Sequence, residues 1–152
     1  ANIGIAPTLL EAGGVRPPNH FDGESFFQLA TGQSIPWRDY LLYEYYWERN
    51  YPHTPTTHSV RGDRYKYIRY HGIWDLNELY DLQEDPYETK NLIESAEHQE
   101  LITNLNTRLF ALLDESKGHT IPLQPDRGPT FPLRHPERGD QGSFPNSWFK
   151  KP

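Results

Sequence analysis

Donor and aromatic side chains gather in one segment of the sequence, between residues 45 and 61. The segment contains histidines and an arginine, whose N–H groups bind anions, and aromatic rings, which stack on ligand faces. Two prolines, Pro52 and Pro55, constrain the loop inside this segment, and a constrained loop on a rigid scaffold is a common place for binding groups. The candidate binding residues are therefore His58, Arg61, His53, Tyr46, Trp47 and Glu48.

The spacing of these residues limits how they can act together. His58 and Arg61 are three residues apart on a predicted strand, so they point the same way only if the backbone bulges between them. His53 and His58 lack the third ligand of a recognisable zinc pattern, and they can equally be solvated loop histidines. Arg64 and Lys66 are expected to be ordinary solvent-facing charges of a hairpin.

Four strands are predicted around this segment. Residues 40–48 alternate in the manner of a strand, with Tyr43, Tyr45 and Trp47 on one face, and most of this aromatic stripe is expected to lie in the core. Further strands are predicted at 57–61, 65–70 and 78–82, and Gly62-Asp63 makes the turn of a hairpin.

One long helix is predicted after the strands. Residues 96–117 place four leucines on one stripe, with Ser95 as the N-cap and Gly118 as the stop. A sheet with one apolar side needs a cover, and this helix can provide it. The predicted fold class is therefore α+β, with an antiparallel sheet of about four strands packed against one long C-terminal helix and an irregular, Pro-rich tail.

The two ends of the chain have a different character. Residues 1–15 are predicted to form a short helix, with Pro7 at its first position and Gly13-Gly14 as its stop. Residues 16–39 are rich in turn-forming residues and are predicted to be a linker. The segment 119–152 contains half of the prolines and no helical or strand period, which indicates an extended tail.

Composition excludes several classes of function. The 152 residues include no cysteine, so neither thiolate metal sites nor a cysteine nucleophile is available. A net charge of −6 argues against a nucleic-acid partner, and a mean hydropathy of −0.85 argues against a membrane-spanning segment. The chain contains no methionine, so we expect it to be a segment of a longer protein.

Four segments, in this order and at these spacings, resemble the last part of type I sulfatases of the alkaline-phosphatase-like superfamily. They are APTLLEAGGV, WRDYLLYEYYWE, HSVRGDRYKYIRY and ELYDLQEDPYETKNLI. Each is weak alone, but four in order make a strong signal, and together they extend over about residues 1–115.

The resemblance implies an enzymatic activity and different roles for two domains of the enzyme. Such enzymes hydrolyse sulfate esters, often on sugars, with calcium and a formylglycine made in a Cys/Ser-x-Pro-x-Arg motif. That nucleophile and the metal ligands belong mainly to a larger N-terminal catalytic domain of the same polypeptide, so no catalytic residue, metal ligand or cofactor is expected in this chain. The parent enzyme is expected to be exported and to bind a sulfated carbohydrate, at which the candidate residues named above would be placed.

The resemblance also suggests a domain division. Residues 1–39 would be a remnant of the large domain and a linker, residues 40–118 the C-terminal subdomain, and residues 119–152 the tail. Two alternatives remain open at this point. One is the equivalent part of a phosphatase or phosphonate hydrolase of the same superfamily, and the other is a freestanding carbohydrate-binding or structural interaction module.

Overall fold

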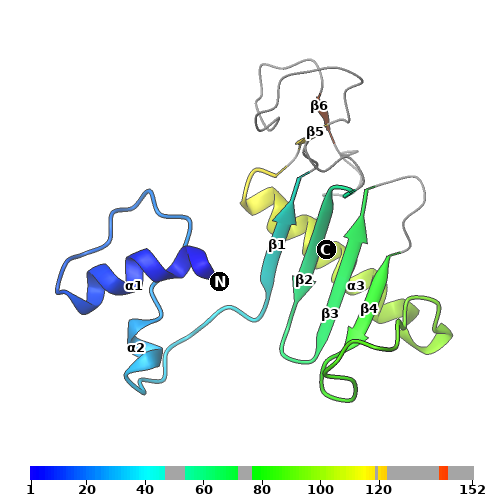
Figure 1. The fold of residues 1–152 in the computed structure, drawn as a ribbon, viewed down its shortest axis with the longest axis horizontal. Coiled ribbons are helices and arrows are strands. Elements are labelled where there is room, and N and C mark those ends of the chain that lie inside the picture. Colours follow the sequence, from blue (N-terminus) through cyan, green and yellow to red (C-terminus); the bar gives the residue numbers. More distant parts are fainter. Residues whose placement is uncertain (47–53, 72–76, 119, 123–140, 144–152) are drawn as a thin grey trace. The chain divides into compact units, whose positions relative to one another are not determined.

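The chain divides into two compact units, residues 1–39 and residues 40–152. The structure is a computed structural model, and it describes residues 1–46, 54–71, 77–118, 120–122 and 141–143 (Figure 1). Three of the candidate binding residues, Trp47, Glu48 and His53, lie outside the described residues.

The first unit is built from short helices. A 3-10 turn, η1 (Asn2–Gly4), leads into α1 (Ile5–Ala12), and a single turn, α2 (Phe27–Ala30), follows later in the chain. The Thr8 hydroxyl joins these segments, since it donates to the Gly4 carbonyl oxygen (2.6 Å) and accepts the backbone N–H of Phe26 (3.0 Å). The predicted helix near the N-terminus is confirmed, but Pro7 occupies its third position, and α2 was not predicted within the linker.

The second unit contains the predicted four-stranded antiparallel sheet. Its strands pair in the order β1-β2-β3-β4, with bounds β1 (Leu41–Tyr45), β2 (Thr57–Arg61), β3 (Tyr65–Tyr70) and β4 (Glu78–Asp81). The pairing is continuous from Leu41 opposite Arg61 to Tyr45 opposite Thr57, so no bulge interrupts β2. Side chains therefore alternate strictly between the two faces of this strand.

A long helix covers one face of the sheet (Figure 1). The 3-10 turn η2 (Ala96–His98) opens into α3 (Gln99–Glu115), which confirms the predicted cover. The stripe on α3 meets the inward residues of three strands because both surfaces are apolar and neither can be left in water. The resulting core consists of Val60, Tyr67, Leu79, Leu105, Leu109, Phe110 and Leu113.

The ends of α3 differ in detail from the prediction. Ser95 occupies the predicted cap position, but its hydroxyl contacts the His98 ring nitrogen Nδ1 (2.8 Å) and makes no capping bond to the helix. At the other end Lys117 has φ 60, so Lys117 makes the left-handed turn that was expected of Gly118. A Cβ at Gly118 would lie 2.8 Å from the Leu113 side chain, so a larger residue there would force neighbouring side chains to shift.

The expectation that the β1 tyrosine stripe forms core is wrong. Leu42 packs against the core from the helix-facing side of β1, and Tyr43, on the opposite face, remains 55% exposed. The register accounts for this, since Leu42 lies opposite Val60, which is fully buried in the core. The two aromatic residues of β1, Tyr43 and Tyr45, therefore lie on the face of the sheet opposite α3.

An ion pair between Arg64 and Asp81 lies at the end of β4. Asp81 accepts two bonds from the Arg64 guanidinium, from Nε (3.0 Å) and Nη2 (2.7 Å), and accepts the backbone N–H groups of Gln83 and Glu84. The bond from Arg64 holds the pKa of the Asp81 carboxyl below its usual value, and the backbone bonds add to this effect. One carboxylate thus joins the β2–β3 turn to the turn after β4.

Replacing this carboxylate should cost stability. We expect Asp81→Ala to lower the free energy of unfolding by about 1–2 kcal/mol, because two backbone N–H groups lose their acceptor. Urea unfolding followed by circular dichroism measures the change, with Glu94→Ala, an exposed acidic residue, as the control. Equal effects of the two substitutions would show that Asp81 does not hold this corner together.

Part of the predicted irregular tail is paired. Thr120–Pro122 (β5) and Gln141–Ser143 (β6) form a short antiparallel ladder. Each strand has only three residues, which is too short for a periodic pattern to predict it. Within the described residues, no helix has the length and apolar character needed to cross a membrane.

Candidate functional site

The helix-facing side of the sheet becomes polar at the end where β1 stops and β2 begins. There Glu44 of β1 lies opposite His58 of β2, and His58 lies opposite Arg69 of β3. The neighbouring pair toward the centre of the sheet is Val60 and Tyr67, which belong to the core. A carboxylate, an imidazole and a guanidinium thus form one row beside the apolar core.

A pair of histidines lies at the centre of this polar end. Nδ1 of His58 and Nε2 of His71 are 2.8 Å apart, and the ring centroids are separated by 4.9 Å at an interplanar angle of 68°. One of these two nitrogens donates and the other accepts, so the contact fixes both rings and couples their tautomers. His58 is fully buried, so this histidine is held within the domain.

The surroundings favour a neutral His71. Burial, with further contributions from His58 and the charge of Arg69, lowers the pKa of the His71 imidazole to about 3. At neutral pH His71 therefore carries one proton on one ring nitrogen, and the histidine pair is not doubly charged.

Tyr46 closes the polar end on the β1 side. Its hydroxyl donates to Oε1 of Glu44 (2.8 Å), and its ring meets the His58 ring edge-on at a centroid distance of 5.5 Å. Gly118, after α3, approaches the same carboxylate, since a Cβ at this position would lie 2.8 Å from Oε1 of Glu44. The chain after α3 thus packs directly on Glu44.

The row is tied to α3 through Arg69. Its Nη1 donates to Oδ1 of Asn106 (2.7 Å), which also accepts the Tyr67 hydroxyl (3.3 Å), and its guanidinium lies 5.3 Å from the Phe110 ring centre. Hydrogen bonds to a charged donor are among the stronger ones, so this contact fixes the helix along the polar end.

The structure brings together only part of the predicted site. Tyr46 and His58 are in contact, whereas Arg61 lies at the far end of β2 and on the opposite face, as the unbulged register requires. Sequence reasoning missed His71 and Arg69. Their signal was present, since Tyr67, Arg69 and His71 follow each other at period two and so share the face of a core residue.

One segment of this chain carries the letters of the nucleophile motif named above. Residues 34–38 read Ser-Ile-Pro-Trp-Arg and match the letters Ser-x-Pro-x-Arg. Ser34 is exposed in an irregular stretch of the first unit, and the Arg38 guanidinium stacks 4.6 Å from the centre of the Trp37 ring. No cluster of three histidine, aspartate or glutamate residues suitable for a metal ion occurs in the described part of the chain.

Comparison with known proteins identifies relatives for most of the chain. This chain is 29% identical over 135 residues to an N-acetylglucosamine-6-O-sulfatase of Bacteroides thetaiotaomicron, and the match covers 85% of this chain and 23% of that protein. It is 31% identical over 132 residues to a Δ4,5-hexuronate-2-O-sulfatase of the same organism, covering 84% and 26%. The chain thus spans about a quarter of the length of the curated relatives it matches.

A solved structure shares the fold described above. It was determined in complex with its substrate, D-glucosamine-2-N,6-O-disulfate, and matches 77% of this chain and 24% of its own with a TM-score of 0.68 and 26% sequence identity. Residues 1–115 match the family model described as N-sulphoglucosamine sulphohydrolase, C-terminal. The chain therefore belongs to this family, the C-terminal subdomain of type I sulfatases.

Proposed function

We propose that this chain is the C-terminal part of a sulfuric ester hydrolase acting on a sulfated glycan, in which it completes the substrate pocket and stabilises the enzyme. The observation that carries the proposal is the match of residues 1–115 to a sulfatase C-terminal family. Two relatives named for sulfate groups on sugars support the glycan class of substrate.

The polar end of the sheet is the part of this chain that we assign to the pocket. Tyr46 is the last described residue before the segment that carries Trp47, Glu48 and His53, and it contacts His58. A sulfated sugar presents an anion and several hydroxyl groups, which such donors and aromatic faces suit. In this proposal the segment after Tyr46 contacts the sugar, while the buried His58 is a positioning residue.

The larger N-terminal domain would supply the chemistry. The formylglycine nucleophile and the calcium ligands expected of the family are assigned to that domain, because this chain matches a C-terminal family and spans only about a quarter of its relatives. The role left to this chain is to orient the sugar so that its sulfate group lies at the nucleophile, and orientation contributes strongly to rate.

A substitution of His58 in the full-length enzyme tests the pocket role. We expect His58→Gln to lower kcat/KM for a sulfated glucosamine about ten-fold, since a displacement of the sugar-binding segment misplaces the reacting group. The matched control is His20→Gln, an exposed histidine of the first unit, which should leave kcat/KM unchanged. An unchanged kcat/KM in a folded His58→Gln enzyme would remove the polar end of the sheet from the pocket.

The Ser-x-Pro-x-Arg letters at residues 34–38 give a separate prediction. We expect Ser34→Ala to leave the activity of the full-length enzyme unchanged, because Ser34 is exposed in an irregular stretch of the first unit and the nucleophile is assigned to the larger domain. Mass spectrometry of the peptide containing Ser34 should show an unmodified serine. Loss of activity together with an aldehyde at this position would instead make Ser34 the nucleophile precursor and reverse the assignment of roles to the two domains.

A further inference from the structure

The polar end of the sheet is the edge at which four strand ends meet. β1 and β3 end there, and β2 and β4 begin there (Figure 1). His58 is the second residue of β2, and His71 follows the last residue of β3. The contact between the two rings therefore links the end of the β1–β2 connection to the start of the β3–β4 connection.

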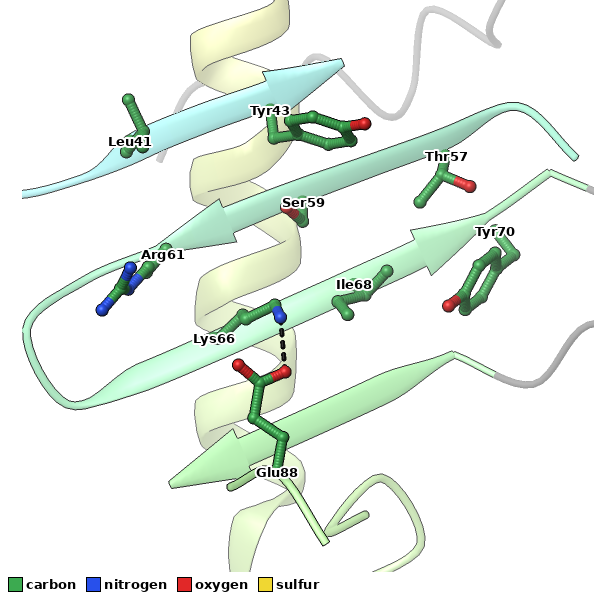
Figure 2. Close-up of a pocket in the computed structure, with 9 residues that line it drawn as sticks. All are labelled: Leu41, Tyr43, Thr57, Ser59, Arg61, Lys66, Ile68, Tyr70 and Glu88. Atoms are coloured by element: carbon green, nitrogen blue, oxygen red, sulfur yellow. Dashed lines mark hydrogen bonds and ion pairs between the residues drawn. The ribbon is translucent and has the colours of Figure 1, made fainter. Parts of the chain in front are cut away.

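Both rings lie on the helix-facing side of the sheet. Figure 2 shows the side chains of Ser59 and Tyr70 projecting from the face away from α3. His58 precedes Ser59 and His71 follows Tyr70, so alternation along the strands turns both histidines toward the helix. The backbone supports this arrangement beyond β3, because the His71 N–H donates to the Thr56 carbonyl oxygen (2.9 Å).

The charges near the pair come from the neighbouring strands and from the helix. The charged residues that these elements bring to this end of the sheet are Glu44 of β1, Arg69 of β3, Glu78 of β4 and Asp114 of α3. Glu78 lies on the opposite face, where it accepts the Tyr70 hydroxyl (3.1 Å). Burial, His58 and the charge of Arg69, in this order, lower the pKa of the His71 imidazole to about 3. This lowering is the net result in the presence of the carboxylates.

The contact between the rings limits how many protons the pair can hold. With one proton on each ring, one of the two facing nitrogens donates and the other accepts. One further proton places a cation in a buried site that already feels the charge of Arg69. A second further proton puts a hydrogen on both facing nitrogens, which then repel each other. Acid therefore favours any opening that brings the pair into water, where a histidine has a pKa of about 6.5.

We propose that His71 is a positioning residue for the proposed reaction: the neutral His58–His71 pair holds the strand ends at the polar end of the sheet, and proton uptake by the pair opens this end and lowers the activity reversibly. The inference rests on the proposed function, which assigns this end of the sheet to the substrate pocket. His71 acts through His58, whose ring contacts the Tyr46 ring just after the end of β1. A displacement of His71 is thus passed to the β1 end, and a small misplacement of a substrate-positioning group costs rate.

Kinetics of the full-length enzyme with a sulfated glucosamine test the positioning role. His71→Phe keeps a ring but removes the nitrogen that contacts His58, so we expect it to lower kcat/KM about ten-fold at pH 7.5. His71→Gln keeps a polar atom near His58, so its kcat/KM at this pH should stay within about three-fold of that of the unmodified enzyme. The matched control is His20→Gln, an exposed histidine of the first unit, which should behave as the unmodified enzyme at every pH.

The pH dependence distinguishes this role from a purely structural one. Between pH 7.5 and pH 5 we expect kcat/KM of the unmodified enzyme to fall at least about three-fold more than that of His71→Gln, because the glutamine takes up no proton. The activity should return when the pH is restored to 7.5.

Hydrogen exchange of the full-length protein gives a readout that needs no activity. After correction for the intrinsic pH dependence of exchange, residues 69–71 should lose protection at pH 5 relative to residues 102–109 of α3. The same segment should keep its protection in His71→Gln.

The outcomes that contradict the inference differ from those that contradict the proposed function. Equal pH profiles for the unmodified enzyme and His71→Gln, or an unchanged kcat/KM in a folded His71→Phe enzyme, would overturn the inference and leave the proposed function intact. Irreversible loss of activity in acid, with unfolding seen by circular dichroism, would also overturn it. If His71→Phe does not fold, the comparison with His71→Gln decides. A full-length protein that hydrolyses no sulfate ester would remove the proposed function, and hydrogen exchange would then decide whether acid opens this end of the sheet.

Discussion

Replacing Phe110 by alanine is expected to destabilise the second unit by about 3–5 kcal/mol, the largest effect of any single truncation considered for this chain. The Phe110 ring is fully buried where α3 crosses the sheet, and it contacts both the apolar core and the guanidinium of Arg69. Its removal leaves a cavity and deprives Arg69 of the ring it lies against. Because domains are stable by only about 5–15 kcal/mol, the variant should unfold at much lower urea concentration.

The matched control is another loss of an aromatic ring. Tyr87 is 87% exposed, so Tyr87→Ala should change the free energy of unfolding by less than about 0.5 kcal/mol. Both variants are compared by urea unfolding of the 152-residue chain, followed by circular dichroism. A cost for Phe110→Ala no greater than that for Tyr87→Ala would mean that the contact between α3 and the sheet is not what stabilises this unit.

The stability of the second unit should fall as the pH is lowered below about 6.5. The pKa of His71 is about 3 in the folded protein and about 6.5 in an unfolded chain, so the unfolded state binds a proton more readily than the folded state. The contribution of His71 is therefore fully present above pH 6.5 and is lost progressively as the pH falls toward 3. The expected loss is about 2 kcal/mol between pH 7.5 and pH 5, and on the order of 4–5 kcal/mol by pH 3.

A histidine substitution isolates this effect from other acid titrations. His71→Gln keeps a polar atom near Nδ1 of His58 but does not titrate, so its unfolding free energy should depend less steeply on pH over this range. His20→Gln, at an exposed position of the first unit, should leave the pH dependence as it is in the unmodified chain. If His71→Gln retained the full slope between pH 7.5 and pH 5, the histidine pair would not be the source of acid sensitivity.

The elements of the second unit were predictable because their signals are local. Strands β2 and β3 have the predicted bounds, and the leucine stripe placed α3 correctly, since period-two and period-3.6 patterns report directly which faces are buried. The fold class followed from the same patterns, since a sheet with one apolar side needs a helix to cover it.

The faces and partners of individual residues were harder to predict. The β1 tyrosines looked like core because they are large, yet the register placed the smaller Leu42 inward and left Tyr43 exposed. Lys117 adopts the left-handed conformation that the adjacent Gly118 would adopt more easily, and a Cβ at Gly118 would lie 2.8 Å from the Leu113 side chain. Which side chain is buried and which residue takes the left-handed conformation depend on contacts between elements. A local sequence pattern does not predict such contacts.

The candidate site shows the same limit. Sequence spacing left open whether His58 and Arg61 act together, and the unbulged pairing of β2 separates them onto opposite faces. His71 was not considered because its role depends on a contact with a residue thirteen positions earlier. Cross-strand pairing creates this contact, so only the register of β2 on β3 reveals it.

Release of inorganic sulfate from a sulfated glucosamine tests whether this chain is part of a glycan sulfatase. The measurement compares the full-length protein that contains these residues with the 152-residue chain at equal concentration. We expect sulfate release by the full-length protein and none by the chain alone, because the nucleophile and calcium ligands are assigned to the larger domain. Sulfate release by the chain alone, or its absence from the full-length protein with every sulfated sugar tried, would contradict the assignment of this chain as the pocket-completing domain of a glycan sulfatase.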